Sequence, residues 1–313
     1  MPSRDLGHQM DRMQRFPYTV IVMLLFVPAV WAQNDLAGKI SCHGAASGVP
    51  ASQNRPYTKK LWDGYEISLS PARNAHGDGD DCTAAIYSGS GRVVFRTTGF
   101  SVIFDGTHTG QDFDGDGKPE IVFITDTGGG NHCCWAYNVV SLWPKPHKLC
   151  DIDEAGGVRF EKDSDGKMVI WQPIRGPYGF TTMARALGAK RVLRVREGKL
   201  VDATPEFCSR IFSDENENYR AWGHDLTPEN IKKLQAAGSL ENLENEDIIS
   251  GLLSRALQRV ACRQFDTALS DLNLWPDATR PRMKAAFAES IKQDYPDFAA
   301  RLMSPDRGRP FLT

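Results

Sequence analysis

The sequence predicts an α+β fold, in which an antiparallel β-rich domain is followed by a small α-helical domain. Two observations lead to this prediction. Short runs with the alternation or β-branched composition of strands recur at close spacing over residues 61–205, as they do in all-β domains. From residue 225 to residue 303 the apolar side chains instead follow the helical period. Residues 206–224 are predicted to form a linker, and residues 304–313 a flexible tail.

The strand candidates are separated by residues that favour turns. Residues 65–70 alternate polar and apolar side chains, which is typical of a strand with one buried face. Residues 82–87 and 92–97 flank a Ser-Gly-Ser-Gly turn and predict a hairpin. Residues 33–60 lack such patterns and are predicted to be an irregular lead-in. The further strand candidates are residues 100–104, 121–125, 135–142, 157–160, 167–174 and 191–195.

Helices are predicted by start signals and by apolar faces. Thr227, Pro228 and Glu229 supply an N-cap, a first-turn proline and an early acid, and predict a helix that ends before Gly238. Apolar residues at helical spacing predict a second helix over 248–261. Two more helices are expected, at residues 263–275 and 281–294.

The N-terminus predicts export. Residues 1–16 carry three arginines, residues 18–31 are mostly apolar, and Val30 and Ala32 offer the small side chains that a signal peptidase reads. We therefore expect a signal peptide over residues 1–32 and a secreted or periplasmic protein without stable membrane insertion; an uncleaved N-terminal anchor is the alternative. The formal net charge of −2 does not favour a nucleic-acid partner.

Alternating carboxylates stand directly before the strand candidate at residues 121–125. The acids are Asp112, Asp114, Asp116 and Glu120, and Gly117 stands where the backbone must turn sharply. Alternate side chains of a tight loop can converge on one point, and Ca²⁺ takes oxygen ligands in this way. An EF-hand loop begins with the same pattern but needs a bidentate Glu at its twelfth position, which is Phe123 here. The alternative is a solvated acidic turn.

This pattern, DxDxDGxxE followed by a strand, resembles the calcium loop of FG-GAP/VCBS repeats, integrin-like units that are often found in β-propeller blades. The resemblance implies Ca²⁺ as the cofactor. The ligands that it implies are Asp112, Asp114, Asp116, the backbone carbonyl of Lys118, and Glu120. A degenerate copy follows at residues 161–167, where Val169 replaces the last acid. For Asp163 and Asp165 the sequence favours a plain hairpin turn over a second ion.

In an exported chain the cysteines are candidates for disulfide bonds. They are Cys42, Cys82, Cys133, Cys134, Cys150, Cys208 and Cys262. Proximity in sequence favours Cys42–Cys82, one of Cys133 and Cys134 with Cys150, and Cys208–Cys262, although sequence alone does not determine connectivity. Because their number is odd, at least one is free or bonded to another molecule.

Residues 127–135 contain a glycine run followed by His132 and two adjacent cysteines. Zinc binding would need convergent ligands, and a Cys–His nucleophile would need a base held by a third group. We favour a Gly-rich turn with one cysteine in a structural disulfide. The segment also resembles an element of uncharacterised exported bacterial proteins, a likeness that covers residues 82–150 and implies no chemistry.

Near the C-terminus, Phe265, Ala268 and Pro276 resemble the second helix of a tetratricopeptide-type hairpin, although Cys262 and Arg263 replace its usual glycine. One such unit cannot form a solenoid. Its apolar stripes are therefore interpreted as core rather than as a groove for a partner.

Two functions follow from these patterns. The first is a binding or scaffold module of the cell envelope, stabilised by Ca²⁺, with an unknown protein or polysaccharide as its ligand. The second is a secreted hydrolase of carbohydrate or cell-wall polymers that uses Asp112–Glu120 or His132 and Cys133. The sequence favours the first, because the clustered acids fit a metal site and no G-x-S-x-G or H-E-x-x-H motif is present. No catalytic residue is assigned.

Overall fold

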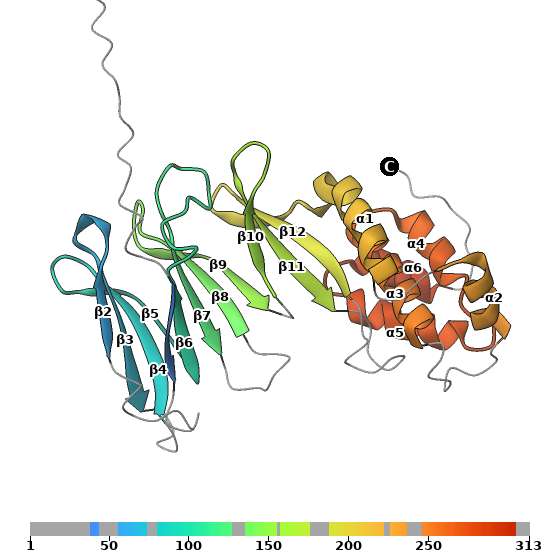
Figure 1. The fold of residues 1–313 in the computed structure, drawn as a ribbon, viewed down its shortest axis with the longest axis horizontal. Coiled ribbons are helices and arrows are strands. Elements are labelled where there is room, and N and C mark those ends of the chain that lie inside the picture. The colour runs from blue at the N-terminus through green and yellow to red at the C-terminus, as the bar shows by residue number, and fades with distance from the viewer. Residues whose placement is uncertain are drawn as a thin grey trace, which may run out of the picture. The chain divides into compact units, whose positions relative to one another are not determined.

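The protein combines antiparallel β-sheets with α-helices, as the sequence predicts. The computed structural model describes residues 38–43, 56–73, 80–126, 135–154, 157–175, 188–221, 226–236 and 246–304. These residues form three antiparallel sheets and six α-helices (Figure 1). The α+β class is therefore confirmed. The predicted signal peptide, and the tail from residue 305 on, lie outside the described residues.

Four consecutive strands pair in sequence order in each sheet. The first sheet contains β2 (Tyr57–Lys60), β3 (Glu66–Arg73), β4 (Asp80–Tyr87) and β5 (Val93–Gly99). The second contains β6 (Ser101–Asp105), β7 (Ile121–Asp126), β8 (Trp135–Ser141) and β9 (His147–Glu154), and β1 (Lys39–His43) joins it beside β6. The third contains β10 (Arg159–Lys162), β11 (Met168–Arg175), β12 (Gly188–Arg196) and β13 (Lys199–Asp202).

The second sheet is buried on both faces, which explains the unbroken apolar run of β7. Ile121 and Phe123 pack into a core shared with the first sheet. Val122 and Ile124 point to the opposite face and share a second core with the third sheet. Successive side chains of a strand alternate between faces, so a strand covered on both sides is apolar throughout.

The predicted lead-in at residues 33–60 is wrong where the structure describes it, because β1 and β2 lie within it. Each is a short strand at the edge of a sheet. β1 pairs with β6 and is tied to β4 by the disulfide Cys42–Cys82. β2 has the sequence Tyr-Thr-Lys-Lys, and charged residues are common on edge strands because they oppose pairing with other chains. β1 alternates polar and apolar residues, but over only five positions, and the four residues of β2 are mostly polar.

The helices follow the third sheet. They are α1 (Thr204–Ala221), α2 (Pro228–Ala236), α3 (Glu246–Ala261), α4 (Phe265–Leu272), α5 (Arg280–Ile291) and α6 (Pro296–Met303). Helices α2 to α6 share an apolar core around the fully buried Trp275. The predicted helices correspond to α2, α3, α4 and α5, whereas α1 and α6 were not predicted. None of the helices in the described residues is long and apolar enough to cross a bilayer.

Helix α1 corrects the predicted linker at residues 206–224, which it occupies as far as Ala221. Phe207 and Ile211 pack on the face of the third sheet formed by Trp171 and its neighbours. Arg210 of α1 donates to both carboxylate oxygens of Glu161, at 2.6 and 3.1 Å, and stacks over the Trp171 ring. These contacts stabilise α1. The second half of this helix is rich in acids and asparagine, so its sequence does not show a helical pattern.

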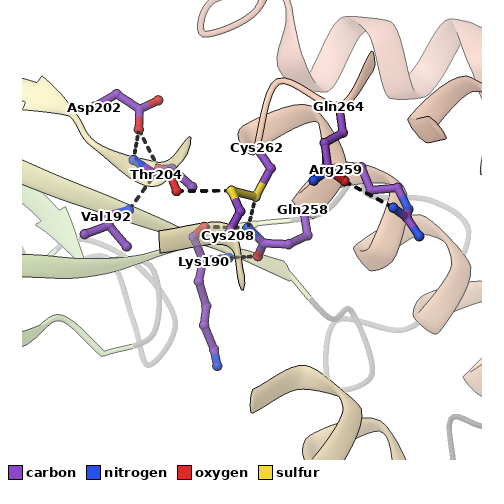
Figure 2. The surroundings of a disulfide bond; sticks show 9 residues. All are labelled: Lys190, Val192, Asp202, Thr204, Cys208, Gln258, Arg259, Cys262 and Gln264. Atoms are coloured by element: carbon purple, nitrogen blue, oxygen red, sulfur yellow. Dashed lines mark hydrogen bonds between the residues drawn. A yellow bond between two sulfur atoms is a disulfide. The ribbon is translucent and has the colours of Figure 1, made fainter. Parts of the chain in front are cut away.

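A disulfide joins α1 to the end of α3, and a buried glutamine of α3 bonds the third sheet (Figure 2). Cys208 of α1 bonds Cys262, which directly follows α3. Gln258 of α3 is fully buried, accepts from the Lys190 amide at 2.7 Å and donates to the Lys190 carbonyl at 3.0 Å. A side-chain amide thus satisfies backbone groups of β12 where β13 does not reach. Leu36–Thr313 form one compact unit, and the division into domains at 61–205 and 225–303 stays a prediction.

Candidate metal centre

The acidic loop connects β6 to β7, two neighbouring strands of the second sheet. It leaves the sheet after Asp105 and returns at Ile121. At its base the Gly110 amide donates to the Glu120 carbonyl at 2.8 Å, and the Glu120 amide donates to the Gln111 carbonyl at 2.9 Å. These bonds close residues 112–119 into a compact turn held by two paired strands.

Three carboxylates converge in this turn. One oxygen from each of Asp112, Asp114 and Asp116 lies within 4.8 Å of the others. The Asp112 carboxylate accepts the amides of Gly115 at 2.7 Å and Gly117 at 2.9 Å. Gly117 has a φ of +81°, a left-handed conformation that glycine adopts without strain. The backbone is therefore folded so that alternate acids face one another, as the sequence predicts.

No basic side chain among the described residues forms an ion pair with the convergent acids. In the described part of the chain no ion pair involves Asp112, Asp114, Asp116 or Glu120. The nearby Lys118 ammonium lies 5.5 Å from the centre of the Trp143 ring instead. Burial raises the pKa of Asp114, and the negative charges of Asp116 and Asp112 raise it further. The site thus has unbalanced negative charge, carried by the hard oxygen ligands that Ca²⁺ prefers.

Glu120 lies beneath the turn and is fully buried. Its Oε2 accepts the Phe113 amide at 2.7 Å, whereas its buried Oε1 has no hydrogen-bond partner among the residues that the structure describes. Burial, with the charges of Asp114 and the other two loop acids, raises the pKa of Glu120 to about 8. It is outside the group of three converging carboxylates. An orphaned buried oxygen beside three unpaired acids fits a bound cation, which would favour the ionised carboxylate.

The second acidic loop provides a contrast within the same chain. It joins β10 to β11 as a tight hairpin, closed by a 2.9 Å bond from the Asp163 amide to the Lys167 carbonyl. Asp163 is paired with Arg194, and Arg210 holds Glu161 at the start of the loop. The predicted hairpin turn is confirmed. Here arginine side chains supply the positive charge that the first loop lacks.

A buried aspartate paired with a half-buried histidine lies at the base of the acidic loop, and sequence reasoning missed the pair. Asp105 ends β6, and its Oδ2 is 2.8 Å from Nδ1 of His108. Burial opposes ionisation of Asp105, but the hydrogen bond and charge of His108, with that of Lys39, hold its pKa below the usual value. The His108 ring packs on Phe160 of β10. An acid at the end of a predicted strand with a histidine three residues later was the available sequence signal.

Two of the three disulfide bonds that the sequence predicts are present in the structure. Cys42–Cys82 and Cys208–Cys262 are disulfides. The expected bond from Cys150 to Cys133 or Cys134 is wrong, because Cys150 is free and buried. It lies in β9 opposite Val139. Burial raises the pKa of its thiol to about 12, which makes it an inert core residue.

The segment with His132, Cys133 and Cys134 lies outside the described residues. No family model, curated protein or solved structure matches the chain. The FG-GAP/VCBS and tetratricopeptide resemblances therefore stay predictions.

Proposed function

We propose that this chain is an exported, calcium-stabilised binding or scaffold protein of the cell envelope. The observation that carries the proposal is the convergence of Asp112, Asp114 and Asp116 without a cationic partner in the described residues. Three like charges this close repel one another in water, and more strongly at a partly buried site. A bound divalent cation removes that repulsion.

Asp112, Asp114, Asp116, the Lys118 carbonyl and Glu120 would hold the ion. This set contains only oxygen donors, which fits Ca²⁺ better than zinc or copper. The bound ion would link the turn to β7, because Glu120 directly precedes that strand. It would also fix Phe113, whose ring packs 5.2 Å from that of Phe160 in the third sheet. Calcium would thereby stabilise the contact between the second and third sheets.

The topology supports a repeated β unit. Each sheet contains a four-stranded meander. The acidic loop joins the first and second strands of the middle meander, and the Asp163 turn joins the corresponding strands of the next. We propose that the two turns are equivalent elements of FG-GAP/VCBS-like repeats, of which only the first binds an ion.

A binding role is favoured over hydrolysis. Within the described residues, a pocket is lined by residues of the first sheet and by none of the loop acids. Two disulfides are typical of exported proteins. The proposed ligand is a protein or polysaccharide at the cell envelope.

Thermal unfolding with and without calcium tests the proposal. A ligand at a hundredfold excess over its Kd stabilises the native state by about 2.7 kcal/mol. Ca²⁺ should therefore raise the Tm of the wild type, and EDTA should reverse the rise. Asp114→Ala should abolish this response. The matched control is Asp165→Ala in the second acidic loop, which should respond like the wild type. A wild-type Tm that is indifferent to calcium at millimolar concentration would refute the site.

A further inference from the structure

A groove lined by both polar and apolar atoms lies on the outer face of the first sheet, away from the acidic loop. Its volume is about 580 Å³, within the usual range for small-molecule sites. It lies beside the β2–β3 turn and the β4–β5 turn, which approach each other at Gly64 and Gly89. Gly64 and Gly91 both have a left-handed backbone at these turns. Among the side chains that line it are Thr58, Lys60, Glu66, Ser68 and Tyr87.

The strand register places the polar side chains on one face. Ile67, Leu69 and Ile86 point into the core shared with the second sheet. The residues between and beside them must therefore point the other way. Lys60 lies opposite Glu66, and Glu66 lies opposite Tyr87, so these three side chains form one row across three strands. Thr58 and Ser68 form the neighbouring row.

The functional groups of this row are available to a ligand. Within the described chain, Lys60, Glu66 and Tyr87 make no side-chain hydrogen bond or ion pair. Lys60 and Glu66 have opposite charges and are direct cross-strand neighbours, yet they do not pair. The groove therefore offers a donor, an acceptor and an aromatic ring in one row, with hydroxyl groups beside them.

The balance of these groups defines the ligand. The single Lys60 charge is offset by Glu66, which disfavours phosphate and other anions. A single carboxylate is a poor cation site, and it also lacks the second acid that glycoside hydrolysis needs. Hydroxyl groups need both donors and acceptors, and the C–H face of a sugar ring packs on an aromatic ring. We propose that this groove binds a neutral oligosaccharide without cleaving it.

This proposal names a ligand for the proposed binding role and rests on it, but the groove shares no residue with the calcium loop. Titration calorimetry of the purified protein with maltohexaose, cellohexaose and hexa-N-acetylchitohexaose provides the test. At least one should bind. Tyr87→Ala and Glu66→Gln should each weaken that binding about tenfold. Arg96→Gln is the matched control, because Arg96 is exposed on β5 and lies outside the groove. Unchanged Tm values establish that the variants fold.

Several results would overturn the proposal. They are no heat from any probe at millimolar concentration, equal affinity in wild type and both groove variants, or a preference for hexagalacturonate over all three neutral probes. Binding that EDTA abolishes and Tyr87→Ala leaves intact would place the sugar at the acidic loop, against this proposal but in favour of a calcium-dependent binding protein. Sugar binding that Tyr87→Ala weakens, in a protein with no calcium response, would support the groove and refute the calcium site.

Discussion

Replacing Glu120 with glutamine tests whether its buried carboxyl destabilises the metal-free protein. Glu120 is fully buried, and burial with the charges of three loop acids raises its pKa from 4.5 to about 8. The folded state thus holds this proton more tightly than the unfolded chain. The stabilisation that comes from this bound proton is fully present below pH 4.5 and is lost as the pH rises towards 8. At neutral pH the loss is about 3 kcal/mol, at about 1.4 kcal/mol per pH unit.

Glu120→Gln keeps the size of the side chain and an oxygen for the Phe113 amide, but it cannot ionise. In EDTA at neutral pH we expect the variant to be more stable than the wild type by about 3 kcal/mol. Near pH 4 the two should unfold alike, because both side chains are then neutral. In calcium the order should reverse, since only the wild type offers an anionic fifth ligand to the ion.

Urea denaturation in EDTA and in calcium, followed by tryptophan fluorescence at several pH values, measures these differences. Asp165→Asn is the control, because that acid is exposed in the second turn and should leave the pH dependence unchanged. Parallel pH profiles for wild type and Glu120→Gln in EDTA would refute the reasoning. A variant less stable than the wild type at neutral pH in EDTA would refute it as well.

Three further predictions concern the contacts that hold the sheets and helices together. Gln258→Leu should lower the free energy of unfolding by about 2 kcal/mol, because buried backbone groups of β12 lose their partner. Urea denaturation measures this difference. A free energy of unfolding equal to that of the wild type would show that water replaces the side-chain amide. Cys208→Ser removes a disulfide that spans 54 residues and should cost about 4 kcal/mol in the chain-entropy model; a Tm equal to that of the wild type would contradict it. Arg194→Met leaves the buried Asp163 carboxylate unpaired and should cost about 3 kcal/mol. Adding Asp163→Asn should restore most of that loss in a double-mutant cycle, and additive losses would exclude coupling of the pair.

Long, strongly patterned elements could be predicted from sequence. β7 begins with four consecutive apolar residues because both of its faces are buried, and α3 has a continuous apolar face in the helical core. Both patterns are local consequences of burial. By contrast, β1 and β2 are edge strands of five and four residues, which are too short to give a strong pattern. β1 also depends on β6, a partner that lies far along the chain. Helix α1 is hard to predict because its second half is rich in acids and asparagine and carries no regular apolar face.

The candidate sites differ in the same way. The acidic loop is visible in the sequence because all its proposed ligands lie within residues 112–120. The groove takes its side chains from three strands, and no short motif connects Lys60, Glu66 and Tyr87. Only the strand register brings them together. The free state of Cys150 also depends on distant packing, because β9 buries it against β8.

Calcium stoichiometry tests the central claim most directly. Equilibrium dialysis against calcium, followed by elemental analysis of the protein, should find one Ca²⁺ per chain in the wild type and in Asp165→Ala. It should find none in Asp114→Ala. A wild-type protein that binds no calcium would contradict the assignment of the ion to the loop between β6 and β7. So would calcium binding that is lost in Asp165→Ala and retained in Asp114→Ala.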